Sequence, residues 1–130
     1  MKKVCLIAFL CCILVSYATE PLDIFRVKSI AFHYDNKWSP EGEYKGVIML
    51  FDDRIVNKSD TGLGEFRIVG EVELTKNPFG NSAIKFECVN QNFEECIIEI
   101  TYVEKFNRRC MYIRYPTHDV RYILKNDDEY

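Results

Sequence analysis

The sequence lacks the features that mark several large classes of protein. None of its 130 residues lie in an amphipathic pattern long enough for a helix. One apolar run lies near the start, too short to span a bilayer comfortably, and no second long one follows, so we expect no transmembrane segment. There is no polybasic stretch, and the formal net charge of −3 argues against nucleic acid or anionic lipid as a partner. No C-x-x-C pair or calcium-loop motif occurs, and we expect no metal site and no cofactor.

The first eighteen residues have the three-part layout of a secretory signal peptide. Lys2 and Lys3 give a positive start, residues 4–15 are almost all apolar, and Ala18 follows Ser16 at a typical cleavage spacing. We therefore predict a signal peptide over residues 1–18 and a secreted, extracellular mature protein of one domain over residues 19–130. Loss of the two lysines makes the mature charge more acidic, −5 against −3 for the whole chain.

Half of the six cysteines leave with this leader. Cys88, Cys96 and Cys110 remain. In an oxidising compartment an odd number predicts one disulfide bond plus one free thiol or one intermolecular bond.

Short runs of alternating apolar and polar residues dominate the mature chain. Aromatic residues make up 14% of the sequence and favour strands. Turn residues separate the runs, a spacing typical of an all-β sandwich or barrel. We expect strands at residues 24–33, 44–51, 65–69, 84–88, 96–102, 110–115 and 120–124, with another beginning at 72–74. The run at 44–51 is nearly all apolar and is predicted to be covered on both faces, whereas 36–42 and 52–64 read as loops and 126–130 as an acidic tail.

The clearest alternation places two cysteines on facing strands. Ile84, Phe86 and Cys88 share one face of a strand, and Cys96 begins the matching face of the next. If these faces point the same way, the two sulfurs lie at adjoining strand ends within reach of a disulfide bond. We therefore predict a Cys88–Cys96 bond and leave Cys110 as the free or intermolecular thiol.

Several segments resemble the nematode transthyretin-like family. Residues 47–53 (VIMLFDD) and 64–70 (GEFRIVG) are similar to its strand, turn and strand signature. Residues 83–88 (AIKFEC) and 96–100 (CIIEI) look like its two cysteine-bearing strands, and 118–124 (HDVRYIL) like its closing strand. The resemblance implies a transthyretin-like, immunoglobulin-like β-sandwich of about seven to eight strands. It also implies secretion, with some members bridging at cell surfaces and no common activity.

Two kinds of enzyme are the alternatives to a binding protein. A related sandwich family hydrolyses 5-hydroxyisourate, but its C-terminal Tyr-Arg-Gly-Ser signature does not occur here. A reactive Cys110 with His118 as its base would need a depressed thiol pKa, and pairing or burial is the expected fate of an exported cysteine. His33 is read with His118 as a polar residue flanking a strand, so we expect no enzyme and no catalytic residue.

The remaining candidate residues have ordinary structural explanations. Acidic residues cluster after the apolar run, but their spacing does not fit a calcium loop and turns explain them: Asp52, Asp53, Asp60 and Glu65. Asn57 begins a glycosylation sequon, Asn57-Lys58-Ser59. Trp38, Tyr34 and Tyr44 flank a loop and can anchor a partner or cover a sheet edge.

The resulting hypothesis is a secreted, extracellular binding protein that catalyses nothing. Its partner is an unidentified protein, lipid or cell surface, and its oligomeric state is left open. The alternative is an oligomeric carrier that encloses a small apolar ligand between subunits, as transthyretin does.

Overall fold

The computed structural model describes residues 20–126. The predicted signal peptide (1–18) and all but the first residue of the predicted tail lie outside these residues. Within them, no helix has the length and the apolar character that crossing a bilayer would require.

The described chain is built of strands, apart from one 3₁₀ turn, η1 (Glu104–Phe106), so the all-β prediction is confirmed. The strands are β1 (Asp23–Tyr34), β2 (Lys37–Trp38), β3 (Gly42–Glu43), β4 (Gly46–Leu50), β5 (Arg54–Ser59), β6 (Gly62–Ile68), β7 (Glu73–Lys76), β8 (Ser82–Asn90), β9 (Glu95–Val103), β10 (Arg108–Arg114) and β11 (Asp119–Leu124).

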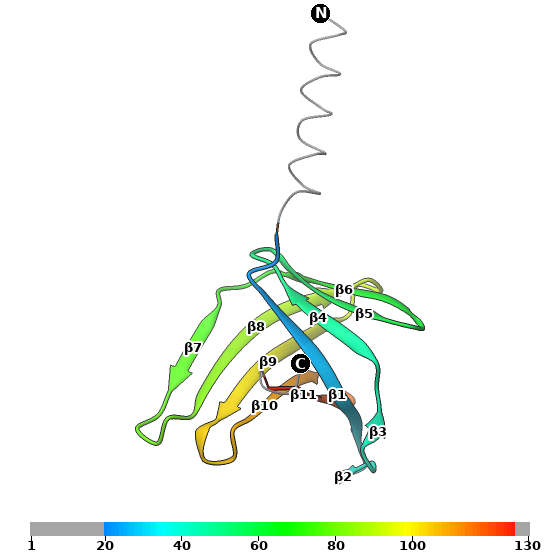
Figure 1. Ribbon diagram of the computed structural model, residues 1–130. Helices are drawn as coiled ribbons and strands as arrows, with labels where there is room; N and C mark the ends of the chain where they lie inside the picture. Colours follow the sequence, from blue (N-terminus) through cyan, green and yellow to red (C-terminus); the bar gives the residue numbers. More distant parts are fainter. Residues whose placement is uncertain (1–19, 127–130) are drawn as a thin grey trace, which may run out of the picture.

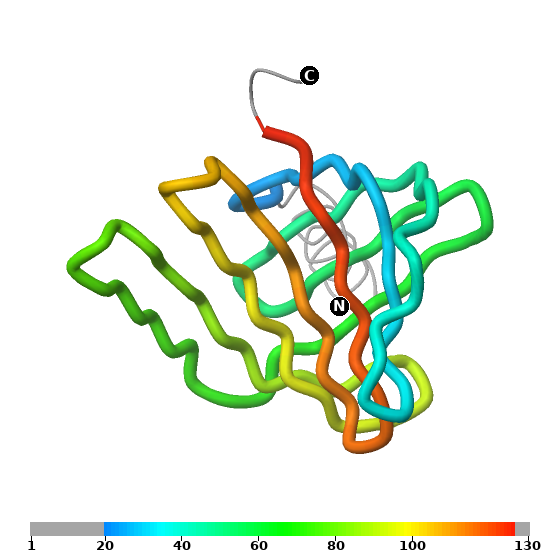
Figure 2. The backbone as a smooth tube through the Cα atoms, turned by 90° about the horizontal axis from the view of Figure 1, so that it is seen from below, coloured from blue at the N-terminus to red at the C-terminus, as the bar shows by residue number. Residues whose placement is uncertain are grey.

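The strands form one sheet that closes on itself. Following the pairing from β1 through β4, β5, β6, β8, β9 and β10 leads to β11, which pairs again with β1. Every neighbouring pair is antiparallel. Figure 2 shows the closing strand β11 in red between β10 in orange and β1 in blue. Hydrogen bonding therefore runs round a ring, whereas a sandwich would divide the strands between two sheets.

Three short strands extend this ring. β2 and β3 continue along β1 beyond β4, and β7 continues along β8 beyond β6 (Figure 1). The turn between β1 and β2 places Asp35 at φ 51° and Asn36 at φ 63°. Two positive φ values in a two-residue hairpin turn are typical of the type I′ turn, which Asp and Asn tolerate. The alternating β1 thus continues directly into a hairpin where the sequence analysis expected a loop.

The interior of the ring is filled by apolar side chains. Successive residues of a strand point to opposite faces, so every second residue enters the interior. Ile48, Ile55, Ile98 and Met111 are completely buried there. They are joined by buried aromatic, aliphatic and cysteine side chains, among them Phe25, Val27, Phe66, Phe86, Cys88, Cys96, Ile100, Ile113, Val120, Tyr122 and Leu124.

Two local predictions require correction. The segment 52–64, expected to be a loop, contains β5, in which Ile55 and Val56 are both buried and which pairs with β4 and β6. The apolar segment 44–51 was expected to be covered on both faces, but β4 has a single fully buried residue, Ile48. Its neighbours Val47 and Met49 are only half-buried, because they point away from the filled interior.

Candidate binding site on the outer face

The candidate site lies on the outer face of β1, β10 and β11. Register places Ala31 of β1 opposite Arg121 of β11, and Arg121 opposite Tyr112 of β10. Directly opposite residues of antiparallel strands share a face, so these three side chains lie in one row across the outside of the ring.

Small residues on β1 allow more distant side chains to reach this row. A register shift between Val27 and Ser29 reverses the alternation of β1, so Ser29 and Ala31 are its outward residues beyond that point, and Ala31 is completely buried. Trp38 of β2 lies over this part of the sheet with its ring edge-on to Tyr112, centroids 6.2 Å apart. Glu41, which precedes β3, reaches across β1 to the same row.

Arg121 links the aromatic and acidic parts of this outer cluster. Its guanidinium carbon lies 4.4 Å from the centroid of the Trp38 ring, a favourable cation–π geometry. Its Nη2 donates to Glu41 Oε1 at 3.3 Å, and Arg108 Nη2 lies 3.5 Å from the same oxygen. The Ser29 hydroxyl donates to the other carboxylate oxygen of Glu41 at 3.4 Å. Glu41 therefore holds two arginines from neighbouring strands in fixed positions.

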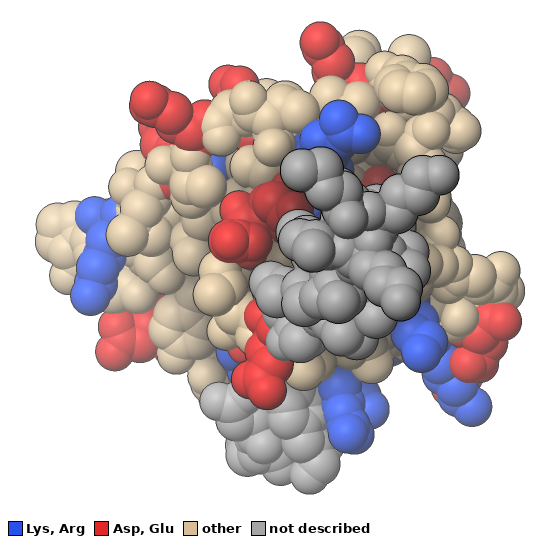
Figure 3. Space-filling view, turned by 90° about the horizontal axis from the view of Figure 1, so that it is seen from above, with Lys and Arg blue, Asp and Glu red and all other residues tan. Residues whose placement is uncertain are grey.

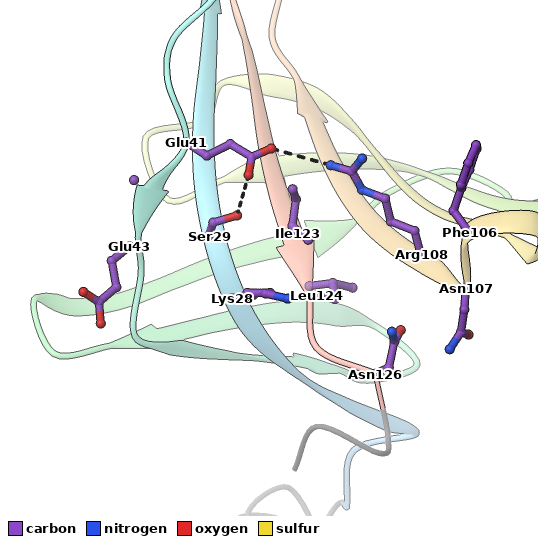
Figure 4. A pocket seen from close by; sticks show the side chains of 11 residues that line it. Lys28, Ser29, Glu41, Glu43, Phe106, Asn107, Arg108, Ile123, Leu124 and Asn126 are labelled. Atoms are coloured by element: carbon purple, nitrogen blue, oxygen red, sulfur yellow. Dashed lines mark hydrogen bonds and ion pairs between the residues drawn. The ribbon is translucent and has the colours of Figure 1, made fainter.

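An open groove of about 590 Å³ borders this cluster (Figure 4). Ile123 of β11 contributes apolar surface to it, and Phe106 of η1, whose side chain is 70% exposed, stands at its margin. Its polar lining comes from both signs of charge and two amides: Lys28, Ser29, Glu41, Glu43, Asn107, Arg108 and Asn126. The groove can bind a polar ligand that also offers some apolar surface.

Charged residues continue from the cluster round the outside of the sheet. Lys85 Nζ lies 3.8 Å from Glu99 Oε2, and Glu99 Oε1 lies 3.5 Å from Arg114 Nη2. Arg114 Nη1 is 3.5 Å from Asp119 Oδ2, which is 3.9 Å from His33 Nδ1. This ladder crosses β8, β9, β10, β11 and β1, and alternating signs keep each charge beside an opposite one.

Both histidines lie at the end of the ring where β1 and β10 turn. His33 is opposite Asp119, the residue after His118, and its ring lies 4.9 Å from that of Trp38. His118 stacks between Tyr34 at 5.1 Å and Tyr115 at 4.8 Å, and its Nδ1 lies 2.9 Å from the Thr117 hydroxyl. The fold thus brings together two histidines that are far apart in the sequence.

Cys88 and Cys96 are direct cross-strand partners on β8 and β9. Both are buried free thiols in this structure, and both line an open pocket of about 550 Å³ with Tyr115 and Pro116. Burial raises the pKa of Cys88 to about 12, with the charge of Cys96 adding to it, and burial together with the charge of Glu94 raises that of Cys96 to about 11. These thiols are therefore poor nucleophiles near neutral pH. The register that the predicted disulfide bond requires is present, and the bond itself stays a prediction.

Cys110 is a free, buried thiol that points away from the other two. It lies opposite Ile123 and Thr101 and is 5% exposed. Burial raises its pKa, and the charge of Arg108 together with a hydrogen bond from that residue opposes this only in part. The thiol consequently lacks the depressed pKa that a catalytic nucleophile needs.

Asn57 lies on β5 and not in a loop. Its Oδ1 accepts from the Tyr44 hydroxyl at 2.8 Å, and its Nδ2 donates to the buried Tyr122 hydroxyl at 3.1 Å. The Tyr44 and Tyr122 rings meet edge-on with centroids 5.3 Å apart. Since a glycan would be attached to that Nδ2 atom, occupancy of the sequon, which stays a prediction, would disturb this polar triad.

The acidic residues of the 52–65 segment are spread along the β5–β6 hairpin. Asp53 Oδ1 accepts from Arg54 Nη1 at 2.9 Å, Glu65 Oε1 lies 4.0 Å from Arg54 Nε, and Asp60 is in the turn. Across residues 20–126, no three His, Cys, Asp or Glu side chains gather closely enough to hold one metal ion.

On the face seen in Figure 3, acidic and basic side chains are interspersed, and neither sign forms a broad patch. No protein-family model, curated protein or solved structure matches the chain. The functional reading therefore depends on the geometry of the site itself.

Sequence reasoning identified only part of this site. Trp38 was singled out as a loop aromatic, but Glu41, Arg108 and Arg121 were not. The alternation of β1 alone would place Ser29 and Ala31 on the same face as the inward Phe25 and Val27, and only the register shift after Val27 turns them outward. Knowing which strands flank β1 requires the closed pairing of the sheet, which the sequence does not state.

Proposed function

We propose that this protein is exported after loss of residues 1–18 and acts as an extracellular binding module that catalyses no reaction. Its partner is a protein, a lipid or a cell surface, and it binds through the outer face of β1, β10 and β11. The observation that carries this proposal is the Glu41–Arg108–Arg121 cluster beside the open groove. Ordered charged and aromatic groups next to accessible apolar surface are what an interface hot spot requires.

The filled interior supports a binding site on the surface. Ile48, Ile98 and Met111 occupy the centre of the ring and are completely buried. A ligand held inside the ring would have to displace such side chains, at a cost of several kcal/mol for each cavity that forms. The groove needs no such rearrangement.

Charge reversal at the cluster tests the proposal. Fluorescently labelled oxidised protein should bind intact cells or extracellular matrix saturably, and Glu41→Lys should abolish that binding by setting a third cation beside Arg108 and Arg121. Asp60→Lys, in the exposed β5–β6 turn, is the matched control and should bind as the unchanged protein does. Absence of saturable binding, or equal loss in both variants, would refute the proposal.

The resemblance to the nematode transthyretin-like family is part of the proposal. It is supported by the order of the motifs along the chain. Residues 64–70 include part of β6 and residues 83–88 include part of β8, and these two strands pair with each other.

The carrier alternative is favoured by one observation, the exposed edge of β7. All four of its residues are exposed, Leu74 by 70%, and the turn that follows exposes Phe79 by 82%. Subunits joined at such an edge would enclose apolar surface between them. A monomer in sizing chromatography that takes up no apolar dye would eliminate the carrier and leave the binding module.

A further inference from the structure

Strand β7 has an edge that no described strand covers. In Figure 1 it lies at the left margin of the sheet, with β8 on one side and an open edge on the other. Among residues 20–126, its only pairing partner is β8. All four residues of the strand are exposed, and none of them is proline. An open edge of this kind offers a row of backbone donors and acceptors to another chain.

The register of β7 on β8 determines which backbone groups face the open side. The Asn77 N–H donates to the Asn81 carbonyl at 2.9 Å, in the same register as the β7–β8 pairing. Hydrogen-bonded and non-hydrogen-bonded residues alternate along an antiparallel pair, so the backbone groups of Thr75 also face β8. The N–H and C=O groups of Leu74 and Lys76 therefore point to the open side.

The side chains beside this open edge include exposed apolar groups. Leu74 lies opposite Ile84 of β8, which packs against the core, so both side chains are on the inner face of the sheet. Because β7 extends beyond the closed ring, Leu74 is 70% exposed there. Val72, two residues earlier, is 53% exposed. The edge thus combines outward backbone groups with apolar surface that the fold leaves in contact with water.

A second copy of β7 is complementary to this edge. In a symmetric antiparallel pair, positions related by the two-fold axis must be of the same kind in the hydrogen-bonding alternation, so one residue faces itself at the axis. With Leu74 at the axis, the two Leu74 residues exchange both backbone hydrogen bonds, and Val72 of each copy faces Lys76 of the other. Leu74 then packs against its symmetry mate, and the alkyl stem of Lys76 covers Val72. On the opposite face Glu73 lies beside Thr75, so no like charges oppose each other in this register.

We propose that two copies of the protein associate through β7, with Leu74 of one copy opposite Leu74 of the other, and so join their sheets edge to edge. The contact requires no bound ligand, which distinguishes it from the carrier alternative. It also goes beyond the proposed binding function, because β8 and β9 separate β7 from β10 and leave the outer face of β1, β10 and β11 open. Each pair therefore presents the Glu41–Arg108–Arg121 cluster twice, and a surface that carries repeated partners is bound with higher avidity.

Charge substitution at Leu74 in the purified protein tests the pairing. Sedimentation velocity should show the unchanged protein in a monomer–dimer equilibrium that shifts to monomer on dilution. Leu74→Lys and Leu74→Glu should each raise the dissociation constant of the dimer by at least about tenfold, because each places two like charges against each other at the axis. Leu63→Lys, at a leucine on β6 that is 56% exposed, is the matched control and should leave the equilibrium unchanged.

An equal mixture of the two charged variants tests the register. Opposite charges then face each other at the axis, so the mixture should regain a one-to-one dimer with a dissociation constant within about threefold of that of the unchanged protein. This recovery would also show that both variants are folded. The proposal is overturned by an unchanged protein that stays monomeric, by a dimer that either charged variant forms alone as tightly as the unchanged protein, by an equal effect of Leu63→Lys, or by a mixture that does not recover. If the unchanged protein is monomeric and still binds cells in a manner that depends on Glu41, the proposed function stands and this inference fails.

Discussion

Strand β10 presents Met111 and Ile113 to the interior of the ring and Tyr112 and Arg114 to its outer face. The inner pair is buried, at 0% and 2% exposure, within the continuous apolar core. The outer pair belongs to the aromatic and charged row that also contains Trp38. A single strand of seven residues thus contributes apolar side chains to the interior and aromatic and charged side chains to the outer face.

The two environments contribute very different free energies to folding. Burying one large apolar side chain contributes about 1.5–3 kcal/mol, whereas an exposed ion pair contributes about 0.2–1 kcal/mol. The interior therefore accounts for most of the stability, and the outer cluster can change with little effect on the fold. The outer face is therefore the part of the molecule that is available for recognition.

The largest expected effect is at the centre of the interior. Ile98→Ala removes a completely buried side chain of β9 and should lower the free energy of unfolding by about 2–5 kcal/mol. The preceding residue, Ile97, is 38% exposed on the outer face, and Ile97→Ala should cost less than about 1 kcal/mol. Urea denaturation measures both, and comparable losses would break the distinction between the two faces.

The next effect concerns the facing cysteines. Non-reducing peptide mapping of the exported protein should link Cys88 to Cys96, which are opposite each other on β8 and β9. Cys88→Ala should then lower the free energy of unfolding by about 2.5 kcal/mol, since the bond closes a nine-residue loop in the unfolded chain. A link from Cys110 to either residue would contradict the assignment, because its side chain lies on the other face.

The polar triad inside the ring should show an intermediate effect. Asn57→Ala leaves the buried Tyr122 hydroxyl without its donor and should cost about 1–3 kcal/mol. Lys58→Ala, the exposed neighbour on β5, is the control and should be close to neutral. Equal stability of the two variants in urea denaturation would show that the triad contributes nothing.

Alkaline pH should destabilise the protein with reduced Cys88 and Cys96 more than the protein in which these residues form a disulfide bond. Burial raises the pKa of both facing thiols from 9.0, that of Cys88 to about 12 and that of Cys96 to about 11. The thiols of the unfolded chain ionise at lower pH than those of the folded chain. The stability that the protonated thiols give the folded state is therefore fully present below about pH 9 and is lost as the pH rises towards the folded pKa values. Urea midpoints between about pH 8 and about pH 11 should fall more steeply for the reduced protein than for the disulfide-bonded one. Parallel profiles would contradict this.

The smallest effect is expected on the outer ladder. Glu99→Gln removes the carboxylate shared by Lys85 and Arg114 and should cost less than about 1 kcal/mol. The loss should shrink further at high salt, because partly exposed charges are screened. A loss above about 2 kcal/mol, measured against Glu95→Gln on the same strand, would show that the outer face stabilises the fold after all.

Much of the fold follows from local pattern. The alternation at Ile84, Phe86 and Cys88 predicts β8 and its inward face, and the same reasoning locates β9 and the facing cysteines. β5 was missed because Asn57 and Lys58 make its second half polar, and its place between β4 and β6 supplies the partners that local pattern does not show.

The candidate site was much harder to predict. Glu41, Arg108 and Arg121 are separated by up to 80 residues along the chain, and an isolated arginine on a strand reads as a solvated face. They meet only because β1 pairs with β11, a contact between opposite ends of the domain. That closure depends on the curvature of the whole sheet, which no short window of sequence encodes.

The pairing of β1 with β11 also sets how the molecule responds to tension. Val27 is opposite Leu124, so the segments before β1 and after β11 leave the ring at the same end. A force that separates those two segments acts on the last hydrogen bonds of this seam first and peels them one after another, instead of shearing them all together. If the protein is pulled by its two flanking segments, β1 and β11 should separate one hydrogen bond at a time under a low force, while the other strand pairs remain intact.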